Sequence, residues 1–325
     1  MCIRDRHYAD AIERLLYNMI ATSPNAEGDR FFYVNPLLVR EPGISTAEGE
    51  APFRKDTLRS TWFWVACCPT NVVRLLSSLT GYFATVHEDA LTVQQYFTGE
   101  ISTRLEDGRE VHVEVTTDYP WNGTISVRVP RSPGRWTLRL RVPSWADGAT
   151  LEVDGGVRAV KAGYAGVTRD WTVGDVVVLH LPMAARLLRA DSRIDALRGT
   201  AAVQRGPLVY CAESVVSADG AVDLDSFRLD PSTRLESVPA AGPSDTAEVV
   251  RVHGVVAAAE TSREWPYPAP ASGGGAPSDV PDPGPGSAEI DLVPYCAWSN
   301  RGPSTMRVWI PLADTADLVR PASRT

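Results

Sequence analysis

Two adjacent cysteines, Cys67 and Cys68, are the residues of this sequence with the most chemistry open to them. A thiolate is both a strong nucleophile and a zinc ligand. The pair stands just ahead of Pro69, which suits the first position of a helix because its missing N–H would have no partner there. Unpaired N–H groups and the positive end of the helix dipole are then expected to favour the thiolate form.

The residue types alone leave three interpretations of the pair open. Free cysteines are often simply buried as small apolar side chains. A disulfide between Cys67 and Cys68 is disfavoured, because bridged Cα atoms prefer a separation larger than that of neighbouring residues. The third interpretation is a nucleophile or zinc site, although two cysteines cannot complete a four-ligand zinc shell by themselves.

The helix that follows Pro69 must position the pair. Gly81 is expected to end it as a left-handed residue. The helix carries an apolar stripe at helical spacing, formed by Val72, Leu75, Leu76 and Leu79.

A second amphipathic helix is predicted over residues 8–20, and it must pack against another part of the protein. Asp10, Glu13 and Arg14 lie on its polar side. Its apolar side consists of Ala11, Ile12, Leu15, Leu16 and Met19. Between the two helices, the aromatic and β-branched residues 31–34 predict a short extended segment.

Other residues that could carry chemistry receive structural predictions. His87, His112 and His180 have no second ligand at metal spacing and are expected to be structural or solvated. Arg205 and Arg301 each precede a Gly-Pro pair, which favours hydrogen bonds that fix loops rather than a catalytic role.

The sequence period changes after residue 82. Residues 90–96, 111–115, 124–129 and 137–142 alternate between apolar and polar, as strands with one buried face do. Strands of this length separated by turn residues predict an antiparallel β-sandwich.

A second β region begins near residue 195. Residues 201–211 predict two short strands bent at Gly206-Pro207, and further strands are expected over 247–259 and 290–312. Residues 266–286 are rich in Pro, Gly and Ser and predict an exposed loop. The aromatic residues of the last strands are expected to be core residues, namely Tyr295, Trp298 and Trp309.

Composition restricts the class of protein. The 325 residues are 44% hydrophobic and 22% charged, as in an ordinary soluble protein. The net charge of −8 argues against a nucleic-acid partner, and no apolar run reaches the roughly 20 residues that cross a bilayer. The five cysteines form no disulfide framework, which favours a reducing, cytoplasmic location.

The first six residues have no apolar core like that of a signal peptide. We expect them to be an artefact joined to a truncated gene, and we do not assign Cys2 as a metal ligand.

Four motifs, in this order, together resemble glycoside hydrolase family 127, the β-L-arabinofuranosidases. They are RFFYVNPL at 30–37, the cysteine run at 62–82, QRGPLVY at 204–210, and PYCAWSNRGP at 294–303 leading to MRVWIP at 306–311. The resemblance extends from about residue 8 to residue 311.

The resemblance implies a multi-domain α plus β fold. Residues 1–86 would be the C-terminal remnant of an (α/α)6 catalytic barrel, and residues 87–188 a middle β-sandwich. Residues 189–325 would form a C-terminal β-sandwich that carries the loop at 266–286. Both sandwiches are expected to be antiparallel.

The resemblance also implies a retaining glycosidase that uses zinc. Cys67 corresponds to the family's nucleophile and Cys68 to a zinc ligand, with both sulfurs in the zinc shell. Tyr33 resembles a tyrosine that faces the sugar, and its alternative is a packed strand aromatic. The family's Glu-x-Cys ligands and its acid/base glutamate have no match in this sequence, so we expect the chain to be inactive alone.

Two alternatives remain. One is a non-catalytic carbohydrate-binding or structural β-sandwich protein, in which the cysteines only pack. The other keeps the fold and changes the glycosidic linkage. The expected partner is an L-arabinofuranoside oligosaccharide or glycoconjugate, with no nucleic acid and no membrane, and the oligomeric state stays open, with a homodimer among the alternatives.

Overall fold

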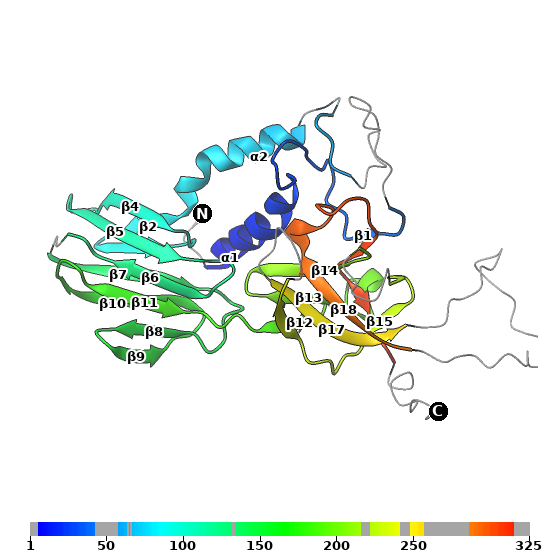
Figure 1. Ribbon diagram of the computed structural model, residues 1–325. Coiled ribbons are helices and arrows are strands. Elements are labelled where there is room, and N and C mark those ends of the chain that lie inside the picture. Colours follow the sequence, from blue (N-terminus) through cyan, green and yellow to red (C-terminus); the bar gives the residue numbers. More distant parts are fainter. Residues whose placement is uncertain are drawn as a thin grey trace, which may run out of the picture.

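The computed structural model describes residues 6–42, 58–63, 65, 67–131, 134–215, 222–240, 248–256 and 286–314. Two expectations fall largely outside this part of the chain: the leader with Cys2, and the loop at 266–286 apart from its last residue, Gly286. The described chain is mostly β, with two helical segments beside two groups of strands (Figure 1).

The first helical segment is α1 (Arg6–Arg14), which continues directly into a π-helical turn, η1 (Leu15–Ile20). The second is α2 (Cys67–Ser78), followed by a 3₁₀ turn, η2 (Leu79–Tyr82). Both predicted helices are therefore present. None of the described helices has the length and apolar character needed to cross a membrane.

Two details of the second helix differ from prediction. The helix begins at Cys67, so the cysteines are its first two residues instead of preceding it. Gly81 lies within the 3₁₀ turn and does not adopt a left-handed conformation. The α-helix ends by passing into this tighter 3₁₀ turn instead of ending at a left-handed glycine. Of the predicted stripe, Val72 is buried, whereas Leu76 is 54% exposed.

The faces of α1 are reversed relative to expectation. The carboxylate residue Glu13, on the polar side, is only 2% exposed, whereas Leu15 and Met19 on the apolar side are 48% and 46% exposed. Glu13 is buried because it meets Arg141 of the middle β region, a partner that helical periodicity cannot reveal.

The middle β region consists of two sheets. One has the order β10-β7-β3-β2 and the other β4-β5-β6-β11-β8-β9. The strands are β2 (Ala84–His87), β3 (Ala90–Val93), β4 (Gly99–Arg104), β5 (Glu110–Thr117), β6 (Thr124–Arg128), β7 (Gly134–Val142), β8 (Thr150–Val153), β9 (Gly156–Ala159), β10 (Gly163–Trp171) and β11 (Val176–His180).

Both sheets contribute side chains to one core. Val113 and Val115 of β5 are buried in the same cluster as Leu138 and Leu140 of β7. This packing follows from the alternation seen in the sequence, which turns one side of each strand inward. The prediction of a wholly antiparallel sandwich is wrong at one strand pair. Strand β3 runs parallel to β7, with Leu91 opposite Leu138.

The C-terminal strands form one hydrogen-bonded network of ten. Nine follow the middle region and the tenth, β1, comes from the segment between the helices. They are β1 (Leu38–Val39), β12 (Ala185–Leu188), β13 (Thr200–Arg205), β14 (Leu208–Glu213), β15 (Phe227–Leu229), β16 (Glu236–Pro239), β17 (Glu248–Val256), β18 (Gly286–Pro294), β19 (Met306–Arg307) and β20 (Ile310–Pro311).

The predicted bend at Gly206-Pro207 is the turn between β13 and β14. Gly206 is left-handed, with φ of 55°, and a Cβ atom there would lie 2.3 Å from the Met183 side chain. Glycine is therefore favoured at this turn by its left-handed backbone conformation, and a larger residue would also have to displace the end of the Met183 side chain.

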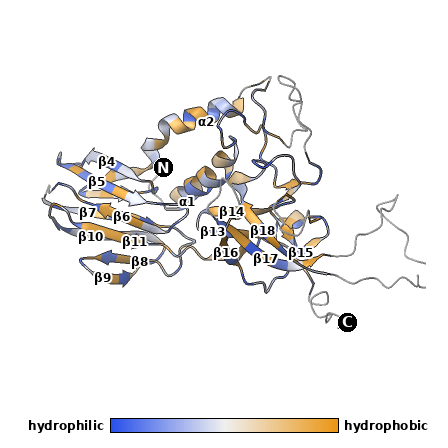
Figure 2. Ribbon diagram, viewed as in Figure 1, coloured by the Kyte–Doolittle hydropathy of each residue, from blue (hydrophilic) through white to orange (hydrophobic). Residues whose placement is uncertain are grey.

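Hydrophobic residues occur along the strands of both β regions, interspersed with hydrophilic ones (Figure 2). Tyr295 and Trp298 are buried as predicted, at 4% and 0% exposure. Trp309 is only half-buried and lines a cavity, so the prediction that it is a core residue is only partly correct.

Candidate active site

The cysteine pair lies at the start of α2 with the two sulfur atoms close together. Cys67 Sγ and Cys68 Sγ are 3.7 Å apart, which is too far for a disulfide bond of about 2 Å. Cys67 is exposed and Cys68 is half-buried. The pair is thus two free thiols in the first turn of α2, and the thiol of Cys67 is accessible.

Side chains of the first helical turn fix the backbone of Cys67. Asn71 Nδ2 donates to the Cys67 carbonyl oxygen at 2.7 Å, and Thr70 Oγ1 donates to the same oxygen at 3.1 Å. The first sulfur is therefore attached to an anchored backbone.

Tyr33 lies against both cysteines. Its hydroxyl oxygen is 3.9 Å from Cys67 Sγ, and Cys68 Sγ donates to the Tyr33 carbonyl oxygen at 3.5 Å. The Tyr33 ring also packs on Phe63, with 5.3 Å between ring centroids. The fold thereby brings Tyr33 beside a cysteine pair that lies more than 30 residues further along the chain.

The C-terminal β region holds the segment that carries Tyr33. Phe32 stacks on Trp298, with centroids 4.9 Å apart and planes 6° from parallel, and the Arg59 guanidinium lies 4.3 Å from the Phe32 ring centroid. On the other side of Tyr33, Tyr295 Oη donates to the Pro36 carbonyl oxygen at 2.7 Å. The position of Tyr33 therefore depends on this region.

Burial works against the thiolate form of Cys68. It raises the pKa of the Cys68 thiol to about 11, and the neighbouring Cys67 adds to the effect through a hydrogen bond and its charge. The expectation that the helix start favours a thiolate is thus reversed at Cys68, because desolvation dominates. A nearby cation is needed to hold this side chain as a thiolate at neutral pH.

The two sulfurs are spaced as zinc ligands would be. Two sulfurs bound at about 2.3 Å to one tetrahedral zinc lie about 3.8 Å apart, close to the observed 3.7 Å. Thiolates also suit zinc chemically. Among the described residues no third His, Cys, Asp or Glu joins the pair, so this part of the chain could supply at most two of the four ligands of such a site.

A cavity of about 1000 Å³ opens beside the pair. Its walls include Tyr33 and both cysteines, residues of η1 such as Asn18 and Met19, and several residues of the C-terminal β region. Most of the lining is apolar. No Asp, Glu or His lines the described part of this cavity, so no group there can act as a carboxylic acid or imidazole catalyst.

Asn18 is a structural residue of the site that sequence reasoning missed. It is 8% exposed, donates from Nδ2 to the Pro207 carbonyl oxygen at 2.9 Å, and accepts at Oδ1 from the Val209 backbone N–H at 2.7 Å. The sequence signal that could have identified it is a polar Asn among apolar residues of a predicted helix. It ties η1, which lines the cavity, to the β13–β14 turn.

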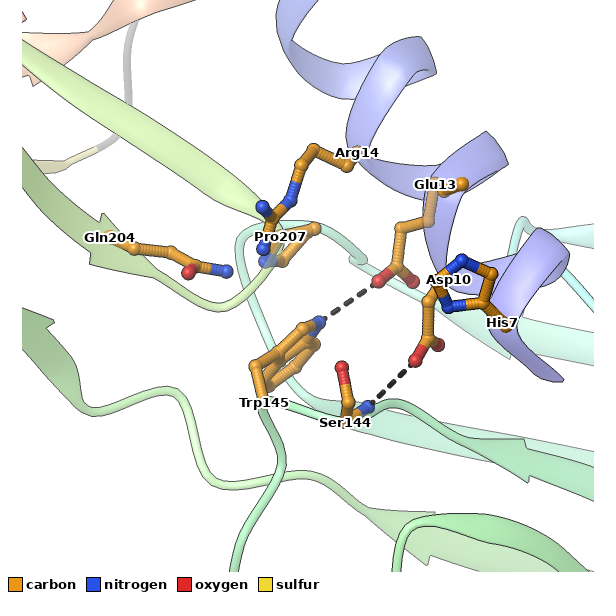
Figure 3. A pocket seen from close by; sticks show the side chains of 9 residues that line it. His7, Asp10, Glu13, Arg14, Ser144, Trp145, Gln204 and Pro207 are labelled. Atoms are coloured by element: carbon orange, nitrogen blue, oxygen red, sulfur yellow. Dashed lines mark hydrogen bonds between the residues drawn. The ribbon is translucent and has the colours of Figure 1, made fainter. Parts of the chain in front are cut away.

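A buried ionic cluster ties α1 to the middle β region. Glu13 binds the fully buried Arg141, accepts a hydrogen bond from Trp145 Nε1 at 2.9 Å, and accepts another from Tyr119 Oη at 2.5 Å. Asp10 binds Arg141 at 2.7 Å. It also accepts a hydrogen bond from the Ser144 N–H, and Figure 3 shows this contact and that of Glu13 with Trp145.

Electrostatics follow from this arrangement. Burial alone would lower the pKa of Arg141, but the Glu13 carboxylate reverses this and raises it. Burial, reinforced by the charge of Glu13, raises the pKa of Tyr119. Arg141 is therefore charged and Tyr119 neutral at all ordinary pH values, and the cluster is a permanent structural link.

The remaining predicted residues are mostly structural. Arg205 pairs with Glu248 at 2.6 Å and donates to the Trp121 carbonyl oxygen, and Arg301 pairs with Glu213 and donates to the Ala297 carbonyl oxygen, as expected of residues that fix loops.

His112 corrects the expectation that no second ligand lies at metal spacing. Its imidazole, Glu100 and Glu114 have ligand atoms within 4.8 Å of one another, because strands β4 and β5 bring them together. Glu114 is already neutralised by Arg128 at 2.5 Å. The ion pair accounts for the charge of Glu114 without a metal.

Comparison with known protein families matches three consecutive segments of the chain to one family. Residues 2–81 match the description "Beta-L-arabinofuranosidase, GH127 catalytic domain", and residues 90–183 match its middle domain. Residues 185–311 match "Glycoside hydrolase family 127 C-terminal domain".

Individual relatives agree. A non-reducing end β-L-arabinofuranosidase from Bifidobacterium longum subsp. longum is 32% identical over 313 residues, which cover 93% of this chain and 45% of that protein. The crystal structure of a GH127 β-L-arabinofuranosidase from Geobacillus stearothermophilus T6 is 33% identical, with a TM-score of 0.76, over 95% of this chain and 47% of that one.

A further solved structure, described as a glycoside hydrolase, is 30% identical with a TM-score of 0.79 and covers 95% of this chain and 49% of that one. The chain thus spans about half the length of the relatives it matches. With three matched segments that together cover nearly its whole length, the chain belongs to glycoside hydrolase family 127.

Proposed function

We propose that this chain contributes the nucleophile and half of a zinc site to a retaining β-L-arabinofuranosidase. Cys67 is the nucleophile, Cys67 and Cys68 are zinc ligands, and Tyr33 faces the sugar. The observation that carries the proposal is the 3.7 Å spacing of two free sulfurs beside the Tyr33 hydroxyl, at the edge of a large cavity in a member of this family.

The reaction proceeds by two displacements. Cys67 Sγ attacks the anomeric carbon, so that a sulfur–carbon bond forms while the bond to the leaving-group oxygen breaks and that oxygen keeps the electron pair. Water then attacks the same carbon, and the sulfur leaves as a thiolate. Two inversions give net retention.

Two properties of the thiols call for a bound cation. Burial raises the pKa of Cys68 and so keeps it protonated, and an alkyl thiolate is only a moderate leaving group. When bound by Cys67 and Cys68, zinc would keep both sulfurs deprotonated at neutral pH and withdraw charge from them. The exposed sulfur of Cys67 faces solvent and the cavity, as a nucleophile must.

The two helical segments fit the proposal that residues 1–86 are part of an (α/α)6 barrel. Exposed apolar side chains lie on α1, η1 and α2, including Leu15, Met19 and Leu76. A groove of about 200 Å³ lies between the segments, and its lining in the described part of the chain is Ile12, Leu15, Leu16, Leu75, Leu79 and Tyr82. Such surfaces are typical of helices that pack against further helices.

The test uses an activated substrate, because no acid lines the described part of the cavity to protonate a poor leaving group. The 325-residue chain, loaded with zinc, is mixed with 2,4-dinitrophenyl β-L-arabinofuranoside. We expect release of dinitrophenolate and a chain heavier by one pentosyl unit, which peptide mass spectrometry locates on Cys67. The same chain is expected to show no hydrolysis of an alkyl arabinofuranoside.

Cys67→Ser is expected to abolish the adduct, and Cys211→Ser, which alters a buried thiol outside the cavity, is the control. An adduct on another residue, or robust hydrolysis of alkyl arabinofuranosides, would contradict the proposed roles. Saccharide binding without any adduct would favour the non-catalytic carbohydrate-binding alternative.

A further inference from the structure

A second cavity, of about 250 Å³, lies where the middle β region meets the C-terminal β region. We call it the junction pocket. Its described lining comes from both regions, with Arg205 at the end of β13 and Glu248 at the start of β17. The polar and aromatic residues of the lining are Trp121, Asn122, Thr124, His180, Arg205 and Glu248.

The junction pocket lies on the other side of β13 from the cysteine cavity. Ala202 lines the cysteine cavity and Arg205 lines the junction pocket. Because side chains alternate along a strand, these two residues point to opposite faces. The two cavities can therefore be tested separately, and the inference below does not depend on the proposed role of Cys67.

The walls of the junction pocket are held in place by contacts within the protein. Arg205 donates to the Trp121 carbonyl oxygen at 3.2 Å and pairs with Glu248 at 2.6 Å. The Leu181 N–H donates to the Gly123 carbonyl oxygen at 2.8 Å, and a Cβ atom on Gly123 would lie 1.9 Å from the Leu181 carbonyl oxygen. Walls that are already ordered lower the entropy cost of binding a ligand.

Two exposed side chains of the lining have hydrogen-bonding groups to spare. Asn122 Oδ1 accepts from the Thr124 N–H at 2.8 Å, and no hydrogen bond within the described part of the chain uses Asn122 Nδ2 or Thr124 Oγ1. Thr124 is paired with His180 between β6 and β11, so their side chains are neighbours on one face. The pocket thus offers an amide donor and a hydroxyl that can donate or accept.

The lining also combines balanced charge with an indole ring. Arg205 and Glu248 are the formally charged residues of the described lining, and they neutralise each other. Trp121 is half-buried, because it packs against the C-terminal core and still lines the pocket. An aromatic body beside a few fixed polar groups suits a ligand that has both apolar and hydroxyl-bearing faces.

We propose that the junction pocket binds one neutral sugar ring. The C–H face of the ring lies against Trp121, and its hydroxyl groups bond to Asn122 Nδ2 and Thr124 Oγ1. A sugar ring carries no charge, as the paired lining requires, and its hydroxyls both donate and accept. The volume of about 250 Å³ is below the range of about 300–1000 Å³ typical for drug-sized ligands, which limits the occupant to a small molecule of this kind.

Saturation-transfer difference NMR on the 325-residue chain tests the pocket through binding alone. The ligands are D-galactose, D-glucose, D-xylose and L-arabinose, with D-galacturonate and D-glucuronate as charged counterparts of the two hexoses. We expect at least one neutral sugar to bind. Its uronate should bind at least about threefold more weakly, because a carboxylate entering the described lining finds its arginine already paired.

Three variants locate the sugar. Asn122→Asp keeps the acceptor for the Thr124 N–H and loses the amide donor, and Thr124→Val is isosteric and loses the hydroxyl. Each is expected to weaken binding by about threefold to tenfold. Trp121→Leu should weaken it at least as much. The matched control is Thr116→Val, an exposed strand threonine outside the described lining, which should change nothing. Circular dichroism verifies folding of each variant.

The possible outcomes separate this inference from the proposed function. Absence of binding by all the neutral sugars, or tighter binding of the uronates, overturns the inference. So does binding that Asn122→Asp and Thr124→Val leave unchanged. If Cys67→Ser, but neither of these variants, removes binding, the sugar lies in the cysteine cavity, which contradicts the junction pocket and leaves the proposed function standing. Binding that depends on Asn122 and Thr124 and survives in Cys67→Ser supports the inference.

Discussion

At the scale of residues, the site depends on two sulfurs whose environments differ. Cys67 is exposed and Cys68 is half-buried with a raised pKa, yet they lie 3.7 Å apart. An exposed sulfur can react with a substrate, and a shielded one can serve as a ligand. The difference is consistent with the proposed division of roles between nucleophile and zinc ligand.

Zinc affinity is expected to depend on pH because binding must displace thiol protons. Burial raises the pKa of the Cys68 thiol to about 11, so it carries its proton at pH 6–8 and would have to release that proton to solvent on binding zinc. Affinity should therefore rise with pH, by about tenfold per pH unit for each proton released. Competition with a chelating dye over this range measures the effect. Cys68→Ser should weaken binding and reduce the slope, and an affinity independent of pH would contradict this prediction.

Tyr33→Phe separates a catalytic hydroxyl from a packed ring. The variant keeps the contact with Phe63 and loses the hydroxyl that lies 3.9 Å from Cys67 Sγ. We expect the unfolding free energy to change by less than about 1 kcal/mol, and formation of the Cys67 adduct to slow by up to about tenfold. Stopped-flow release of dinitrophenolate and urea unfolding give the two values. An unchanged rate would favour the packing interpretation.

At the scale of elements, α1 is held by charge rather than by its apolar face. Glu13, Asp10 and Arg141 form a cluster in which Arg141 is fully buried and Glu13 nearly so. Removing one partner of a buried pair leaves an uncompensated charge in a dry environment, which costs far more than the pair gains in net stability.

Glu13→Ala is therefore expected to destabilise the fold by about 3–5 kcal/mol, measured by urea unfolding. The matched control is Glu110→Ala, which breaks the exposed pair with Arg104 and should cost no more than about 1 kcal/mol. If the two variants lost the same stability, α1 would not depend on the buried cluster.

At the scale of the whole molecule, the chain contains separate hydrophobic cores. One lies between the two sheets of the middle region and includes Leu138, and another lies in the C-terminal network and includes Leu229. Tyr17 of η1 packs against both. The described chain is thus two β regions joined through the N-terminal helical segment.

Two β regions with separate cores predict two calorimetric transitions. Leu138→Ala and Leu229→Ala each remove a fully buried side chain and should cost about 2–5 kcal/mol. We expect Leu138→Ala to lower mainly the transition temperature of the middle β region, and Leu229→Ala mainly that of the C-terminal β region. A single transition shifted equally by both variants would mean that the regions unfold as one unit.

Local pattern was enough to predict the helices and the most regular strands, but not short strands such as β1, β15 and β16. Strict alternation gave the strands around residues 111–115 and 124–129, and the bend at Gly206-Pro207 is present because glycine and proline restrict the backbone directly. Helical spacing predicted both helices. The division of the chain at residues 86 and 188 stays a prediction.

The sequence by itself determined the two helices and the most regular strands, and that a pair of cysteines stands at a helix start, because these depend on neighbouring residues. Only the tertiary structure decided which faces are buried. Glu13 is inside and Leu15 outside, and β3 runs parallel to β7, because partners distant in the chain set burial and pairing. The same holds for the cavity, since its walls come from both ends of the chain.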